Sequence, residues 1–203
     1  HDFNKEEKAE VLIVRLKEGM NVALVTDAGT PGISDPGYYL IRRANEEKIP
    51  VSPVPGPTAV IAALSVSGLP LDSFIFEGFL PSRKIARQKH LKSLAPEKRT
   101  LIFFESPHRL KASLQDIEDF FGDRPMTLTR ELTKVHEEVL RGTVSGILRS
   151  LEGKGVRGEI TLVIGGDREG DGGPRNQSLP SPASFIPDLT QLLTSGIKVK
   201  EAA

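Results

Sequence analysis

The chain has 203 residues, of which 27 are basic and 27 acidic, so its formal net charge at pH 7 is zero. A zero net charge gives no overall field toward nucleic acid or a membrane, and such binding would need a local patch. The lack of cysteine excludes disulfides, thiolate zinc sites, iron–sulfur clusters and a cysteine nucleophile. With no disulfide, no signal peptide and no apolar run of about 18 residues, we expect a cytoplasmic protein without a membrane partner.

The first part of the chain predicts helices and strands in alternation. Apolar residues at helical spacing between Ala9 and Leu16, with Gly19 after them, indicate a first helix. The apolar run 22–26 is typical of a buried strand. The elements expected next are a helix over 38–47, a strand over 51–54 and an apolar helix over 58–64.

The second part continues this alternation. Residues 73–79 have the pattern of a strand, and 82–94 form a basic helical pattern. The elements expected after these are a strand over 100–104, a helix over 107–121, neighbouring strands over 126–130 and 135–141, a short helix over 143–151 and a strand over 160–164. This order of elements predicts an α/β fold.

Composition divides the chain into parts. We expect one α/β domain over 1–70 and a second over 71–166. Residues 167–187 are rich in glycine, proline, serine, asparagine and aspartate, a composition typical of a linker. The last part, 188–203, is expected to hold a partial helical segment.

Two loops follow predicted strands and are dense in glycine and proline: DAGTPGISDPG at 27–37 and PGPTA at 55–59. Ligands of open α/β sheets bind where strands end and helices begin. Glycine lets the backbone approach a ligand closely, and proline fixes the loop shape. Neither loop has the phosphate-binding GxxxxGK[ST] pattern or the dinucleotide-binding GxGxxG pattern. From spacing alone, ordinary tight turns explain them equally well.

Six motifs in order give a more specific signal. The two loops are the first two motifs, and the second of them continues to GLP at 68–70. The other four are FEGFLP at 76–81, FFESPHR at 103–109, RELTK at 130–134 and GE at 158–159. With these motifs, residues 1–166 resemble the tetrapyrrole methylase superfamily, and within it the branch that methylates ribosomal RNA. The resemblance implies two α/β domains with a cofactor cleft between them, and a homodimer.

The resemblance also implies an activity. We expect methyl transfer from S-adenosylmethionine to the 2′-hydroxyl of a cytidine ribose in the decoding region of 16S rRNA, within the small ribosomal subunit. Family members open with a strand, a Pro-x-Gly-Asn loop and an acidic Glu-Asp-Thr-Arg segment. These precede the residues present here, so the domain over 1–70 is expected to lack its first strand, and the far C-terminus is expected to be truncated.

The resemblance implies cofactor contacts for the residues of this chain that occupy the matching motif positions. Most of them are expected to act through the backbone, because the loops bring main chain against the ligand. The expected cofactor-binding residues are Ala28, Gly29, Thr30, Ile33, Thr58, Ala59, Glu105 and Leu132.

Methyl transfer to a ribose hydroxyl also needs a route for the hydroxyl proton. The candidate bases are Asp27, Asp35, Glu77, Glu105, His108 and Glu131. Glu77 and Glu131 rank first because their motifs distinguish the RNA-methylating branch. Any one of these carboxylates can instead be a helix cap or a surface ion pair.

RNA binding needs positive charge on the surface. The segment 82–92 contains five lysines or arginines, and the expected RNA-binding residues are Arg83, Lys84, Arg87, Arg109 and Lys134. A solvated helix face is the alternative interpretation of such a charge run. Four histidines and no cysteine form no recognisable metal-ligand cluster, so no metal is expected.

Three other functions remain open from the sequence. One is a same-fold methyltransferase for a tetrapyrrole or a protein acceptor, against which the FEGFLP and ESPHR motifs argue. Another is a non-catalytic protein that binds S-adenosylmethionine or RNA. The third is a plain nucleotide-binding α/β domain.

Overall fold

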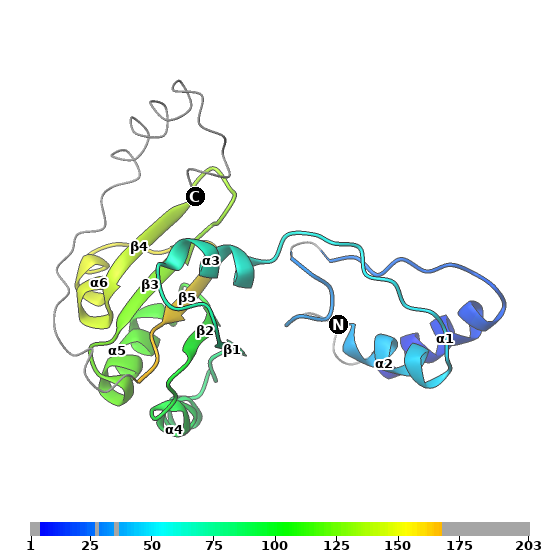
Figure 1. The fold of residues 1–203 in the computed structure, drawn as a ribbon, viewed down its shortest axis with the longest axis horizontal. Coiled ribbons are helices and arrows are strands. Elements are labelled where there is room, and N and C mark those ends of the chain that lie inside the picture. Colours follow the sequence, from blue (N-terminus) through cyan, green and yellow to red (C-terminus); the bar gives the residue numbers. More distant parts are fainter. Residues whose placement is uncertain (1–4, 27–28, 35–36, 168–203) are drawn as a thin grey trace. The chain divides into compact units, whose positions relative to one another are not determined.

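The structure is a computed structural model that describes residues 5–26, 29–34 and 37–167. These ranges hold six helices and five strands, which confirms the α/β class (Figure 1). In chain order they are α1 (Lys5–Lys17), α2 (Tyr38–Glu46), α3 (Ala59–Ser67), β1 (Phe74–Phe79), α4 (Lys84–Leu94), β2 (Thr100–Glu105), α5 (Leu110–Phe121), β3 (Pro125–Arg130), β4 (Glu138–Thr143), α6 (Val144–Ser150) and β5 (Ile160–Ile164). Apart from Asp167, the expected linker and the helical segment over 188–203 lie outside the described residues.

The five strands form one sheet in the order β1-β2-β5-β3-β4. Strands β1 and β2 are parallel, whereas β5 runs antiparallel to both of its neighbours, β2 and β3. Strands β1, β2 and β3 therefore point the same way and end at one edge of the sheet. We call this the carboxyl-end edge, and the register across it aligns Glu105, Ile160, Arg130 and Glu138.

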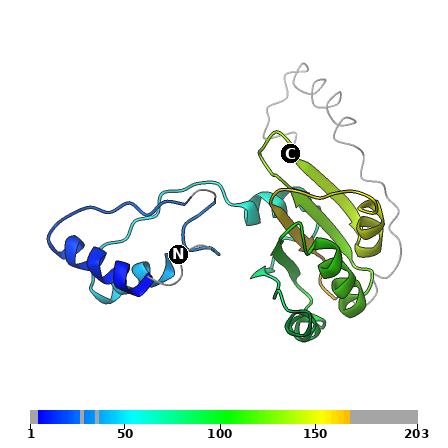
Figure 2. The same ribbon diagram turned by 180° about the vertical axis from the view of Figure 1, so that it is seen from behind.

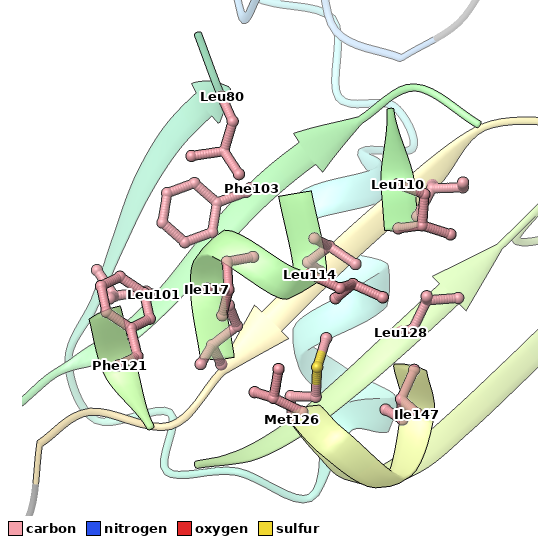
Figure 3. Close-up of a cluster of buried hydrophobic side chains, with 14 of the residues drawn as sticks. Leu80, Leu101, Phe103, Leu110, Leu114, Ile117, Phe121, Met126, Leu128 and Ile147 are labelled. Atoms are coloured by element: carbon pink, nitrogen blue, oxygen red, sulfur yellow. The ribbon is translucent and has the colours of Figure 1, made fainter. Parts of the chain in front are cut away.

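One face of the sheet carries the main hydrophobic core. Alternate residues of β2, Leu101 and Phe103, point into it, as the two-residue period of a strand requires. Helices α5 and α6 cover this face (Figures 2 and 3). Leu91 of α4 also packs into this core. All three side chains are fully buried.

The opposite face of the sheet is covered by α3. Its Val60 and Leu64 pack with Ile102 of β2 and Val163 of β5. The end of α3 is fixed over the amino end of β3, because the Thr127 hydroxyl donates a 2.9 Å hydrogen bond to the Ser67 carbonyl. The beginning of α3 therefore points toward the carboxyl-end edge. Helix α3 thus packs on the sheet of the expected second domain, although its residues belong to the expected first domain, 1–70. The domain boundary near residue 70 stays a prediction.

Helices α1 and α2 pack against each other. Ala9, Ile13 and Ala44 are buried between them. Arg43 of α2 also donates a 2.7 Å hydrogen bond to the Glu10 carboxylate of α1. Both helices were expected, the first from its apolar spacing and the second over 38–47.

The two strands expected over 22–26 and 51–54 are not formed, so this part of the prediction is wrong for the described residues. Val25 is 79% exposed and Val54 is 90% exposed. A strand is stable only when neighbouring backbone satisfies its N–H and C=O groups. The apolar runs predicted burial, but no described strand pairs with either segment.

A buried ion pair joins α4 to α5. The Arg87 guanidinium donates a 2.7 Å hydrogen bond from Nε to the Asp116 carboxylate, and Gln88 donates to the other carboxylate oxygen at 2.8 Å. Arg87 is only 4% exposed. Its assignment to an RNA-binding surface is therefore corrected: the arginine turns inward because Asp116 faces it from the next helix.

We predict that Asp116→Ala lowers the free energy of unfolding by about 3–5 kcal/mol, because it leaves the Arg87 charge buried without its partner. The double substitution Arg87→Met with Asp116→Leu is expected to cost much less. Urea unfolding measures both, with the exposed-pair variant Arg42→Gln as the control. Equal losses in the single and double variants would contradict this account.

Candidate functional site

Four of the six sequence motifs meet at the carboxyl-end edge. FEGFLP covers the end of β1, Glu105 ends β2, Glu131 follows β3 and Glu159 precedes β5. These segments lie far apart in the sequence, and the alternation of strand directions brings them together. Helix α3, whose first turn follows the PGPT motif, begins toward the same edge.

The loop after residue 26 depends on glycine. Gly29, Gly32 and Gly37 all have positive φ, and a Cβ on Gly37 would lie 2.8 Å from the Leu24 side chain. Within the loop, the Ile33 amide donates to the Thr30 carbonyl at 3.2 Å. Only glycine combines this backbone with this packing. Three predicted residues of the loop, Asp27, Ala28 and Asp35, lie outside the described residues.

The two predicted cofactor loops touch. The Thr30 hydroxyl donates a 3.3 Å hydrogen bond to the Pro57 carbonyl, directly before the N-cap of α3. Thr58 occupies that N-cap in an extended conformation, and its side chain makes no capping hydrogen bond. The first turn of α3 therefore presents amide groups that a polar ligand can use.

Glu105 is buried, and its carboxylate is bound by three protein donors. One oxygen accepts from the Ser106 amide at 2.6 Å and pairs with Arg109 at 2.7 Å. The other oxygen accepts from the Ser113 hydroxyl of α5. The side chain thus shapes the loop after β2, and any contact of Glu105 with a cofactor falls to its backbone. Sequence reasoning missed Ser113, which gave no motif signal.

Arg109 ties two motifs together. Besides the Glu105 pair, its guanidinium donates to the Ser106 hydroxyl at 3.0 Å and to the Leu80 carbonyl at 3.2 Å. The ESPHR segment is thereby fixed to the FEGFLP segment. Its guanidinium is occupied by three protein acceptors, which leaves little of it for the RNA contact that the sequence predicted.

The first candidate base, Glu77, extends toward α4. Its carboxylate lies 3.1 Å from His90 Nε2, and both side chains are partly exposed. Ile75, two residues earlier on β1, packs into the core that α5 and α6 cover. Glu77 is therefore on the side of the sheet opposite α3. His90 belongs to the basic helix, and nothing in its spacing marked it as a partner of Glu77.

The second candidate base, Glu131, is engaged by neighbours. One of its oxygens accepts from the Glu159 amide at 2.8 Å and from the Lys134 ammonium at 3.0 Å. These donors lower the pKa of the Glu131 carboxyl below its ordinary value. The group is ionised at neutral pH, and a lowered pKa makes it a weaker base.

Leu132 and α3 share an apolar cluster. The partly buried Leu132 packs with Phe76 and Phe104 against the Val60 side of the sheet. Phe104 also contacts the Phe79 ring at 5.5 Å between centroids, and Phe79 is 55% exposed. The carboxyl-end edge thus offers apolar side chains beside the first turn of α3, a combination suited to a ligand with both apolar and polar parts.

Helix α4 presents positive charge at the surface. Arg83 and Lys84 are exposed, as expected, and so are Lys89 and Lys92 further along the helix. The described ion pairs include none of these four side chains. We call them the α4 basic face. The fifth predicted residue, Lys134, is bound to Glu131 and Glu159.

Two features are absent from residues 5–26, 29–34 and 37–167. No group of three or more histidine or acidic side chains there is arranged to hold a metal ion. Within the same ranges, no helix has the length and apolar character needed to cross a membrane.

Several bacterial proteins are similar over the whole chain or most of it. The chain is 43% identical over 204 residues to the Ribosomal RNA small subunit methyltransferase I of Synechocystis sp., covering all of this chain and 71% of that protein. It is 48% identical over 166 residues to the protein of that name from Thermotoga maritima, covering 82% of this chain and 74% of the relative.

Solved structures show the same fold at low sequence identity. The crystal structure of the methyltransferase CobJ matches with a TM-score of 0.58 at 18% identity, over 82% of this chain and 74% of that one. The uroporphyrin-III C-methyltransferase from Thermus thermophilus, complexed with S-adenosyl homocysteine, matches with a TM-score of 0.53 at 17% identity, over 79% and 73%.

The family model for Tetrapyrrole (Corrin/Porphyrin) Methylases matches residues 1–148. That match spans well over half of the chain. The motif order, the fold and the sequence similarity lead to one assignment: the chain belongs to the tetrapyrrole methylase family.

Proposed function

We propose that the protein transfers a methyl group from S-adenosylmethionine to the 2′-hydroxyl of a cytidine ribose in the decoding region of 16S rRNA. The observation that carries this proposal is the meeting of the family's motif segments at one edge of the sheet. The names of relatives that are 43% and 48% identical support the choice of ribosomal RNA over a tetrapyrrole or a protein acceptor.

The residues present fit the proposed cofactor. S-adenosylmethionine has a polar amino-acid end and a nucleoside, and its sulfonium supplies an activated methyl group. The glycine-dependent loop and the uncapped start of α3 offer backbone groups, and the cluster around Leu132 offers apolar contact. The residues that we propose to hold it are Ala28, Gly29, Thr30, Ile33, Thr58, Ala59, Glu105 and Leu132.

The protein's remaining chemical task is to orient the ribose and accept its hydroxyl proton. Glu131 and Glu77 are the two carboxylates proposed for this role, and the donors to Glu131 lower the pKa of its carboxyl, which makes it a weaker base than an ordinary glutamate. Glu77 stays a proposed base, although its side chain lies beside His90 on the side of the sheet opposite α3, so the ribose would have to reach it past the end of β1. A homodimer in the cytoplasm stays a prediction.

RNA contact is assigned to Arg83, Lys84 and Lys134, with Arg109 acting through the loops that it joins. The α4 basic face extends this set by Lys89 and Lys92 and replaces Arg87, which is buried. Helix α4 starts just past the end of β1, so its first turn lies beside the carboxyl-end edge. Phosphates along α4 would bring a ribose toward the proposed cofactor site.

The direct test incubates the complete gene product with labelled S-adenosylmethionine and small ribosomal subunits that lack this methylation. Nuclease digestion and mass spectrometry then locate the label. We expect it on the ribose of one cytidine in the decoding region. Label on protein, or no label while cofactor binding is intact, would contradict the proposed substrate.

We predict that combining Arg83→Gln, Lys84→Gln, Lys89→Gln and Lys92→Gln flattens the salt dependence of RNA binding. Each lost phosphate contact reduces the slope of log K against log[salt] by roughly 0.7–0.9, so the total change is about 3. Filter binding at several salt concentrations measures the slope.

The matched control neutralises four exposed basic residues elsewhere, with Lys8→Gln, Arg42→Gln, Lys48→Gln and Arg149→Gln. It should leave the slope unchanged. An α4 variant that behaves like this control would show that the α4 basic face does not contact RNA.

A further inference from the structure

The turn between β3 and β4 holds a strained backbone. Glu131 has φ of 50° and Thr133 has φ of 65°, although neither is glycine. Side chains disfavour this left-handed region, most strongly for a β-branched residue such as threonine. Such a conformation persists only where the surroundings determine it fully, and it is common at functional sites.

Glu131 supplies the contacts that hold this turn. Its amide donates to the Glu159 carbonyl at 3.0 Å, and its carboxylate accepts from the Glu159 amide at 2.8 Å. Lys134 donates to the same carboxylate oxygen at 3.0 Å and lies 3.2 Å from the Glu159 carboxylate. Glu131, just after β3, is thereby hydrogen-bonded to both the carbonyl and the amide of Glu159, just before β5.

Gly158 completes the arrangement. A Cβ at this position would lie 2.5 Å from Glu131 Cγ and 2.7 Å from its Oε1. Gly158 also has φ of +93°, which favours glycine. The Glu131 side chain therefore lies directly against the Gly158 backbone, and the GE motif at 158–159 has a physical explanation. We call the contacts of Glu131 with Gly158 and Glu159 the latch.

The latch bears on the proposed cofactor wall through Leu132. This leucine follows Glu131 immediately and packs in the apolar cluster with Val60 of α3. A shift of the turn would move Leu132 relative to the first turn of α3, where Thr58 and Ala59 lie. The carboxylate itself is occupied by the Glu159 amide and Lys134, which suits a structural contact rather than proton transfer.

We propose that Glu131 is a positioning residue, whose latch to Gly158 and Glu159 holds Leu132 in the cofactor-binding wall, and that it is not the general base. This inference rests on the proposed use of S-adenosylmethionine. The lowered pKa of the Glu131 carboxyl agrees with it, because the latch then stays ionised at neutral pH.

The test compares two ways of breaking the latch with one way of keeping it. Glu131→Ala removes the acceptor, and Gly158→Ala blocks its place. Glu131→Gln keeps an acceptor oxygen for the Glu159 amide. Gly155→Ala is the matched control, because a Cβ there meets nothing within 4 Å. Titration calorimetry with S-adenosylmethionine gives the dissociation constant, and methylation of small ribosomal subunits across pH gives the rate profile.

We expect Glu131→Ala and Gly158→Ala to weaken S-adenosylmethionine binding by about tenfold to a hundredfold, because the binding wall around Leu132 would no longer be preorganised. For Glu131→Gln we expect a dissociation constant for S-adenosylmethionine within about twofold of the parent value, a change on the scale of one exposed ion pair. The methylation rate of this variant should have the same pH profile as that of the parent. If Gly158→Ala fails to fold, Glu131→Ala still carries the comparison.

Two results would overturn the proposal. One is unchanged cofactor binding in Glu131→Ala. The other is a large fall in kcat with an altered pH profile in Glu131→Gln while cofactor binding is intact, which would make Glu131 the base. Amide exchange at residue 159 reports the latch without any cofactor, so loss of protection in Glu131→Ala identifies the latch even if the parent protein binds no S-adenosylmethionine. If the parent protein binds no S-adenosylmethionine, the proposed function is wrong, and the positioning role of Glu131 is wrong with it.

Discussion

The site depends on the antiparallel insertion of β5 between β2 and β3. Because β5 opposes both neighbours, β2 and β3 run the same way, and the parallel β1 joins them. Three strand ends and the start of β5 therefore meet at one edge. Burial of β2 and β5 on both faces fixes this order, since Ile102 and Val163 face α3 while Phe103 and Leu162 face the opposite core.

At that edge the ionisable side chains mostly hold the protein itself. Glu105, Arg109 and Ser113 lock the loop after β2, and Glu131 holds the turn after β3. The groups left for a cofactor are backbone amides and apolar side chains. This division suits methyl transfer from an activated sulfonium, where alignment matters more than acid–base chemistry. We propose that the charges that attract the RNA substrate lie outside this edge, on α4.

The sequence predicted the secondary structure best where a residue pattern was compatible with only one type of element. The apolar run of β2 and the spacing of α5 predicted both elements to within a few residues of their bounds. The expected strands over 22–26 and 51–54 failed because a strand needs a partner that local patterning does not reveal. Arg87 was misplaced for a similar reason, since its partner Asp116 lies 29 residues away on another helix. The latch was equally hidden, because it depends on a contact between positions 131 and 158.

The central claim is that the cofactor binds at the carboxyl-end edge on the α3 side. Hydrogen–deuterium exchange of the complete gene product, with and without S-adenosylhomocysteine, tests it most directly. The account predicts added protection in residues 29–34, in the first turn of α3 and at 131–133, with α5 unchanged. Protection confined to α4 or to the core around α5 and α6, with none at these three segments, would contradict it.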